Sequence, residues 1–350
     1  MIPHFRPLFD LSDEEAVVRA LRSGYIAQGA EVEKFEEEMA HLIGVKYAVA
    51  VNSGTAALHL ALLSLNIGPG DEVIIPSYVC SALLNAVRYT QAKPVIADID
   101  ELTFNISPAD VGKKLSPKTK AIVVPHMFGL PADLEGLSKF GIPLIEDCAQ
   151  SLGSHYHGKL TGSIGRLAVF SFYTTKVIAA GEGGMVLTDE AQLAKRIREI
   201  RAYDEKDTDA VRFNYKLTDL QAALGRSQLN KLDSFLNRRQ EIARFYHETL
   251  KKIGMPSPHV PEGSRHIYFR YCLSLNQPDV FIRKMADRGI TCRRPVYRPL
   301  HYYLKGESCP VAERVWQKTI SIPLYPALTD EEVSHIGQVL TELHKEGFVW

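Results

Sequence analysis

Residues 47–65 read YAVAVNSGTAALHLALLSL, and they predict a buried strand, a tight turn and a helix in succession. Residues 47–51 are apolar without alternation, which is expected of a strand covered on both faces. Residues 55–65 are rich in Ala and Leu, which favour a helix. Residues 52–54, Asn-Ser-Gly, have the composition of a turn. This unit indicates an α/β fold.

The same rhythm of strands and helices continues to about residue 190. Continuously apolar or β-branched runs predict further strands, and amphipathic stretches predict helices between and after them. We therefore expect a mainly parallel central sheet flanked by helices on both sides. The expected strands are 72–75, 94–98, 121–124, 143–147, 167–172 and a return strand at 183–187; the expected helices are 81–88, 190–201 and 218–252, the last with a break near 232–236.

The length of 350 residues fits about two domains. Pro and Gly cluster at residues 254–258 and 261–263, which is typical of a boundary. We expect a large domain over residues 1–250 and a smaller C-terminal α+β domain over residues 251–350. The small domain should hold strands at 266–275 and 290–294, and a final helix that starts at the capping box of residues 329–332.

Composition excludes several classes of protein. Lys plus Arg and Asp plus Glu are equal at 41 each, so no bulk charge favours nucleic acid or an anionic membrane as a partner. The five cysteines are scattered without a CxxC pair, which argues against a disulfide framework, a structural zinc site and an iron–sulfur cluster. No apolar run approaches ~18 residues and no signal core is present, so we expect a cytoplasmic protein.

Two ionisable side chains follow buried strands of the predicted sheet. Asp147 ends the strand at 143–147, and ligands of open α/β sheets bind beyond the carboxyl ends of the strands. An aspartate there can pair with a protonated ring nitrogen, or it can simply cap a helix. Lys176 follows the strand at 167–172, where burial would lower its pKa and make the amine nucleophilic; an exposed loop lysine is the alternative.

The turn between the first strand and its helix can bind an anion. Gly54 permits the turn, and Thr55 and Ala56 would present free N–H groups at the helix N-terminus. A plain capped helix start is the alternative. The Walker pattern GxxxxGK[ST] is missing, and the Gly-rich residues 181–184 lead into a strand, which is the wrong order for dinucleotide binding and argues against an NAD oxidoreductase. Ser171 could add a hydroxyl donor to the anion.

Three motifs in order carry a resemblance to a known family: SGTAAL at 53–58, EDCAQ at 146–150 and SFYTTK at 171–176. The similarity includes GPGDEVI at 68–74, NYKLTDLQAA at 214–223 and IPLYP at 322–326. Over nearly its whole length the chain resembles the sugar aminotransferases of the DegT/DnrJ/StrS family, which depend on pyridoxal 5'-phosphate (PLP).

The resemblance implies the aspartate-aminotransferase fold (type I) and a homodimer with shared active sites. It implies transfer of an amino group from an amino acid, expected to be L-glutamate, to a nucleotide-linked keto-sugar, in amino-sugar and cell-surface polysaccharide biosynthesis. Lys176 would form the internal aldimine with PLP and later move the proton, while Asp147 pairs with the pyridine nitrogen. The other implied site residues are Gln150 at the ring's phenolic oxygen or face, Gly54, Thr55, Ala56 and Ser171 at the phosphate, Cys80 facing the ring, Asn214 sent by the partner subunit, and Glu182, His301 and Tyr325 at the substrate.

Departures from the family pattern leave alternatives open. The family usually places an aromatic residue where Cys80 stands, so either a sulfur contact or Tyr78 would take the place of ring stacking. Some relatives are sugar dehydratases in which histidine replaces the lysine, whereas Lys176 stands here. A PLP-binding regulator or sensor without turnover is a further alternative, as is a cyclic ketone without a nucleotide. The basic segment 293–298 either faces a substrate diphosphate or is a solvated loop.

Overall fold

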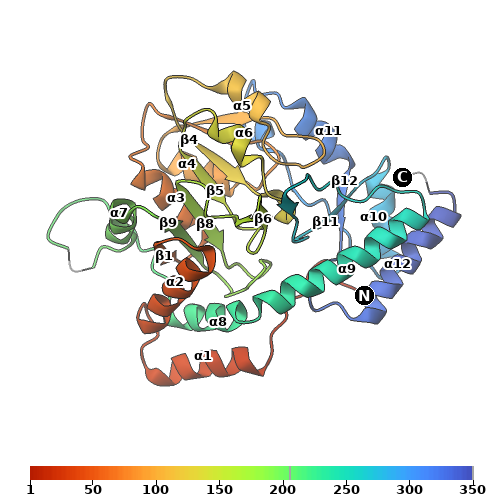
Figure 1. Ribbon diagram of the computed structural model, residues 1–350, viewed down its shortest axis with the longest axis horizontal. Helices are drawn as coiled ribbons and strands as arrows, with labels where there is room; N and C mark the ends of the chain where they lie inside the picture. The colour runs from red at the N-terminus through yellow and green to blue at the C-terminus, as the bar shows by residue number, and fades with distance from the viewer. Residues whose placement is uncertain (205, 349–350) are drawn as a thin grey trace.

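The computed structural model describes residues 1–204 and 206–348, and its centre is a sheet of seven strands (Figure 1). The strands, in sheet order, are β1 (Tyr47–Val51), β9 (Gly184–Thr188), β8 (Leu167–Ser171), β5 (Leu144–Asp147), β4 (Thr119–Pro125), β2 (Glu72–Pro76) and β3 (Lys93–Ala97). Neighbours from β8 to β3 pair in parallel. Only β9 and β1, at one edge, pair antiparallel. The predicted mainly parallel sheet is confirmed.

Helices cover both faces of the sheet, as the sequence predicts. Successive residues of a strand point to opposite faces, so Val49 and Ala50 of β1 belong to two different hydrophobic cores. The core on the first face includes α3 (Gly54–Ser64), α4 (Ala82–Tyr89) and α7 (Ala191–Arg201). The cores on the second face include α2 (Ala30–Ile43), α5 (Pro108–Lys114), α6 (Leu134–Ser138) and α8 (Asp219–Leu229).

The C-terminal part forms a second lobe with its own core, built around a two-stranded sheet. Its elements are α9 (Leu232–Lys252), β11 (Tyr271–Ser274), α10 (Pro278–Ala286), β12 (Thr319–Ile322) and α12 (Asp330–Lys345). The predicted capping box at the start of α12 is present. The expected domain boundary at residue 250 falls inside α9, which ends at Lys252. The division of the chain into domains at this point stays a prediction.

Two predicted strands of this lobe are wrong in extent. Only Tyr271–Ser274 of the predicted strand 266–275 is a strand, because Tyr268 adopts a left-handed φ of 52° and the N–H of Ile267 bonds to the Gly129 carbonyl instead of a strand. Residues 290–294 form no strand either; they make isolated bridges at Ile290 and Arg293.

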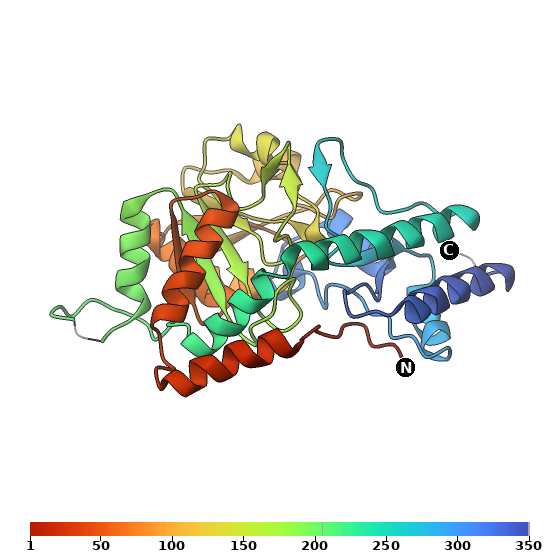
Figure 2. The ribbon, with the colours of Figure 1, turned by 60° about the horizontal axis from the view of Figure 1, so that its bottom comes forward.

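The remaining elements border the sheet and link the lobes. Figure 2 shows the first residues of the chain running from the C-terminal lobe to α1 (Leu11–Ser23), which packs on α8. No helix among the described residues is both long and apolar enough to traverse a bilayer. The other elements are η1 (Met127–Gly129), β6 (His155–Tyr156), β7 (Lys159–Leu160), β10 (Ser264–Arg265), η2 (Leu300–Tyr303) and α11 (Pro310–Lys318).

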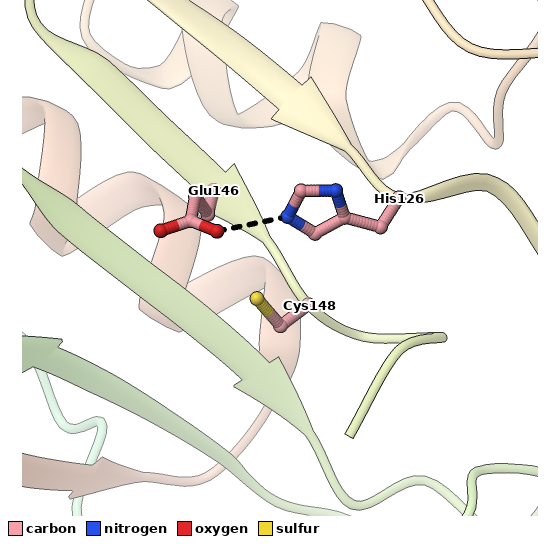
Figure 3. Close-up of side chains that lie close together, drawn as sticks. All are labelled: His126, Glu146 and Cys148. Atoms are coloured by element: carbon pink, nitrogen blue, oxygen red, sulfur yellow. Dashed lines mark hydrogen bonds and ion pairs between the residues drawn. The ribbon is translucent and has the colours of Figure 1, made fainter. Parts of the chain in front are cut away.

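A buried carboxylate ties the end of β5 to its surroundings (Figure 3). Glu146 is fully buried and accepts a 3.0 Å hydrogen bond from Nε2 of His126, which follows β4. Burial disfavours the charged carboxylate, but its hydrogen-bond donors outweigh this effect and lower the pKa of Glu146. Three further bonds of 2.6–2.8 Å come from the backbone N–H groups of Gly162, Ile164 and Gly165.

We expect the substitution Glu146→Gln to lower the free energy of unfolding by about 2–4 kcal/mol at pH 7, because it leaves buried donors poorly satisfied. The pKa of Glu146 is lower in the folded chain than in the unfolded chain, whose value is about 4.3. The stabilisation is therefore complete above that value and is lost as the pH falls through the folded pKa. Urea unfolding at pH 7 and at pH 3.5 should show the difference shrinking at the lower pH.

Glu37→Gln serves as the matched control, because Glu37 is exposed on α2. Its unfolding midpoint should follow that of the wild type at both pH values. Equal midpoints for the wild type and Glu146→Gln at pH 7 would show that the charged hydrogen bonds of Glu146 contribute nothing to stability.

Candidate active site

Three predicted residues come together at the carboxyl edge of the parallel strands. Asp147 ends β5, Lys176 follows β8 and Cys80 follows β2. The pKa of the Lys176 amine responds to the charges of both other groups, and the pKa of the Cys80 thiol responds to Lys176 and Asp147. We call this group of Cys80, Asp147 and Lys176 the Lys176 recess.

The environment of Lys176 favours its neutral, nucleophilic form. Burial is the main cause that lowers the pKa of its amine, and the nearby Arg270 cation lowers it further. Cys80 and Asp147 oppose this shift without cancelling it. The Lys176 Nζ atom lies 5.7 Å from the centre of the Phe269 ring, so one wall of the recess is aromatic.

Asp147 is a buried carboxyl group that has a hydrogen-bond donor but no directly paired cation among residues 1–204 and 206–348. It is only 8% exposed, and burial raises its pKa, although the Ala149 N–H, Lys176 and His126 act against the rise. The Ala149 N–H donates to Oδ1 at 3.0 Å, and no described side chain donates to this carboxylate. A protonated ring nitrogen would supply the missing donor and the missing charge, so Asp147 fits a pyridinium.

The turn before α3 forms a cradle of hydrogen-bond donors that could hold a phosphate. The Ser53 side chain caps α3 by accepting from the Ala56 N–H at 3.1 Å, which leaves the N–H groups of Gly54 and Thr55 without an intrahelical partner. A Cβ added at Gly54 would lie 2.8 Å from Cβ of Ser171. Only glycine therefore lets the turn approach the Ser171 hydroxyl this closely. The prediction that the Ala56 N–H is free for the anion is wrong, because the Ser53 side chain takes up that N–H, and Gly54 takes its place beside Thr55.

Cys80 remains accessible to solvent although protein atoms crowd around it, and burial raises the pKa of its thiol. Tyr78, the alternative for contact with the ring, is fully buried and packs edge-on and tilted against Phe128 and Phe104. Tyr78 is therefore not available for contact with the ring, and Cys80 is the residue of this segment that belongs to the recess.

Two other predicted residues lie beside the recess and the cradle. The side-chain oxygen of Gln150 accepts from the Phe128 N–H at 3.1 Å, which turns its amide nitrogen toward other acceptors. The Asn214 carbonyl accepts from the Asn52 side chain of the same chain at 3.2 Å, immediately before the Ser53 turn, and the Asn214 side chain is exposed.

The three predicted substrate residues are not joined to the recess by hydrogen bonds or ion pairs in the described part of the chain. His301 is buried and its Nδ1 lies 2.6 Å from the Ser77 hydroxyl. Tyr325 is fully buried beneath Phe5. Glu182 is exposed, and its peptide carbonyl accepts from a glutamine of α8.

Two neighbours of the recess were not predicted from the sequence. Arg270 and Phe269 lie in the segment predicted to be regular strand, so their position between the lobes was hidden by a wrong element. His126 was missed as well, yet it directly follows a predicted parallel strand, where ligand and anchor residues gather. A place directly after a predicted parallel strand was a usable signal for His126. No comparable signal pointed to Arg270.

His126, Glu146 and Cys148 lie close enough to suggest a metal site (Figure 3). However, Nδ1 of His126 accepts the Ala132 N–H at 3.0 Å, so Nε2 carries the proton that it donates to Glu146. Both oxygens of Glu146 accept backbone N–H groups. Because these lone pairs are engaged, the cluster is better explained as a structural hydrogen-bond network.

Comparison with known proteins agrees with this geometry. GDP-perosamine synthase of Escherichia coli O157:H7 is 34% identical, with 99% of each chain covered. A protein of Acidithiobacillus ferrooxidans named as a UDP-N-acetyl-3-dehydro-alpha-D-glucosamine 3-aminotransferase is 34% identical, over 96% of this chain and 95% of that one.

Solved structures agree as well. The aminotransferase TlmJ of Streptoalloteichus hindustanus superposes with a TM-score of 0.94 at 32% identity, with 99% of each chain covered. The PLP form of Spr1654 of Streptococcus pneumoniae gives a TM-score of 0.89 at 27% identity, with 97% of each chain covered. The predicted fold class, that of the PLP-dependent aminotransferases, is thus confirmed. Residues 9–341 match the family itself, and the chain belongs to the DegT/DnrJ/EryC1/StrS aminotransferase family.

Proposed function

We propose that this chain uses PLP bound at Lys176 to transfer an amino group from L-glutamate to a nucleotide-linked keto-sugar. The observation that carries the proposal is the Lys176 recess, in which the Lys176 amine and the buried Asp147 carboxyl group influence each other's pKa without forming a direct ion pair among the described residues. The names of the relatives support a nucleotide-linked sugar, because they specify GDP-linked and UDP-linked substrates or products.

The described residues provide a place for each part of PLP. The N–H groups of Gly54 and Thr55 and the hydroxyl of Ser171 would hold the phosphate. Asp147 would keep the ring nitrogen protonated, and the Gln150 amide would donate to the phenolic oxygen. When bound, PLP supplies an electron sink for the carbon that loses its proton.

Lys176 performs two tasks in this proposal. Its amine, whose pKa is lowered mainly by burial, would hold the cofactor covalently until the amine of the donor replaces it. Once the donor has displaced it, the free amine moves a proton from the donor carbon and later returns one to the sugar carbon. Both tasks require the Lys176 amine to lie close to the proposed cofactor. The position of Lys176 after β8 would place it there.

Two alternatives remain distinguishable from transamination. A sugar dehydratase is disfavoured because Lys176 occupies the position where the dehydratase relatives carry histidine. A regulator without turnover would also bind PLP, but it would not convert glutamate to 2-oxoglutarate. Single-turnover incubation with glutamate therefore separates an aminotransferase from a regulator without turnover.

We also propose a homodimer in which the subunits share the active sites. The Asn214 side chain is exposed and lies next to the phosphate cradle. In a homodimer, the Asn214 segment of one subunit would reach the phosphate that is bound by the other subunit. Large apolar side chains are exposed on α1 and just after it, beside a hollow of about 1030 Å³. They are Leu11, Leu21, Tyr25 and Ile26.

We expect Lys176→Ala to lower turnover by at least about 10³-fold, because both the covalent bond and the proton transfer are lost. The measurement is formation of 2-oxoglutarate from glutamate in one turnover. In the wild type, borohydride reduction followed by peptide mass spectrometry should find the cofactor on Lys176. Lys159→Ala, at an exposed position of β7, is the control. Trapping of the cofactor on another lysine would refute the assignment.

We expect Asp147→Asn to retain PLP but to lower the rate of proton removal from glutamate by about 10²-fold or more, since a neutral amide cannot hold the ring nitrogen protonated. The rate is read from the decay of the visible absorbance of the loaded enzyme after mixing with glutamate. Asp189→Asn, at the exposed position that directly follows β9, is the control. A rate equal to that of the wild type would remove Asp147 from the mechanism.

A further inference from the structure

Arg270 is a partly buried cation beside the Lys176 recess that forms no ion pair with a carboxylate among the described residues. Its guanidinium packs on the Phe269 ring, with Cζ 5.2 Å from the ring centre. Burial is the main cause that lowers the pKa of Arg270 to about 10, and the nearby Arg293 adds to the shift. An arginine in such a place is incomplete, because a buried charge is costly until an anion pairs with it.

The position of Arg270 relates it directly to the reactive amine. Lys176 Nζ and Arg270 Cζ both lie against the same Phe269 ring, at 5.7 and 5.2 Å from its centre. The charge of Arg270 also affects the pKa of Lys176. The two cationic groups therefore lie close enough for their charges to interact.

His4 holds the guanidinium in its orientation. Arg270 Nη1 donates to His4 Nδ1 at 2.9 Å, and because arginine is only a donor, Nδ1 carries no proton. The other ring nitrogen, Nε2, then donates to the Ser321 hydroxyl at 2.6 Å. Burial, with help from the two arginines, lowers the pKa of His4 to about 3, so the ring is neutral at physiological pH. One side of the guanidinium is thereby fixed, and its other N–H groups remain for a ligand.

The backbone of Arg270 is tied to the turn that positions Gln150. Its N–H donates to the Phe128 carbonyl at 3.3 Å, and the Phe128 N–H donates to the Gln150 side chain. A Cβ at Gly129 would lie 2.6 Å from the Ile267 side chain, so the turn and the segment before β11 fit closely. Arg270 is therefore held at a defined place relative to the proposed cofactor.

We propose that Arg270 binds a carboxylate of the amino-acid donor while the donor's amine takes the place of Lys176. The inference rests on the proposed function. The α-carboxylate of an amino acid is attached to the carbon that carries the amine, so its partner must lie near the amine that is displaced. The diphosphate of a nucleotide-sugar lies a sugar ring away from the reacting carbon. A guanidinium offers two parallel N–H groups, which match a carboxylate.

The test measures binding of glutarate, an unreactive dicarboxylate, to the PLP-loaded protein by calorimetry. We expect Arg270→Gln to weaken glutarate binding by about 30-fold or more, as loss of charged hydrogen bonds does. Arg270→Lys should weaken it less, because the charge remains while the fork is lost. Arg244→Gln, at an exposed position of α9, should bind like the wild type. Glutaramide, which is neutral, should bind weakly to all four proteins.

A spectroscopic readout separates ligand binding from a purely structural role. Removing the Arg270 charge should raise the pH midpoint of the visible absorbance change of the loaded enzyme, because a like charge near the Lys176 nitrogen disappears. Arg244→Gln should leave this midpoint unchanged. Loss of thermal stability in Arg270→Gln without a change in midpoint or glutarate affinity would overturn the proposal and leave Arg270 a structural residue.

The remaining outcomes are also decisive. Loss of glutarate binding in Arg293→Gln but not in Arg270→Gln would assign the carboxylate to the exposed arginine and overturn the role of Arg270. Equal glutarate affinity of PLP-loaded wild type and Arg270→Gln would refute this subsite and leave the proposed function intact. A wild type that takes up no PLP would refute the proposed function, and the subsite with it.

Discussion

The site depends on the fixed direction of one strand end. Successive residues of a strand point to opposite faces, so anchoring Glu146 determines where Asp147 points. Glu146 is anchored by His126 and by three backbone N–H groups, all within 3.0 Å. A change of register at β5 would exchange the two carboxylates and place the anchored one at the recess. The acid that faces the proposed cofactor is thus defined by its neighbour, which faces away from it.

Burial acts on the two reactive groups in opposite directions and prepares both. It raises the pKa of Asp147 and lowers the pKa of Lys176, so each group is biased toward its neutral form. A protonated ring nitrogen next to Asp147 would restore the carboxylate, and a neutral amine at Lys176 is the form that attacks an aldehyde. The same low-polarity surroundings therefore suit both ends of one flat cofactor.

The parts predicted correctly from the sequence are those determined by local pattern. The continuous apolar runs predict the parallel strands, and their carboxyl ends locate Asp147, Lys176 and the Ser53 turn. Long-range contacts decide the rest. Residues 266–270 look like strand but bond to the turn at Phe128 and Gly129, and residues 290–294 only bridge to other segments. Arg270 becomes visible only when that packing is known.

That turn links the two lobes at the recess. Phe128 and Gly129 both have positive φ, of 58° and 94°, and their carbonyl and N–H groups reach Gln150 on one side and the segment of Arg270 on the other. A strained backbone of this kind persists only where surrounding contacts determine it. The large lobe carries the groups proposed to hold the cofactor, and the segment before β11 carries Arg270, which no described carboxylate pairs with. This turn therefore sets the distance between the proposed cofactor and the proposed donor. A change at Arg270 would therefore act on the proposed donor subsite and, through its charge, on the pKa of Lys176 in the recess.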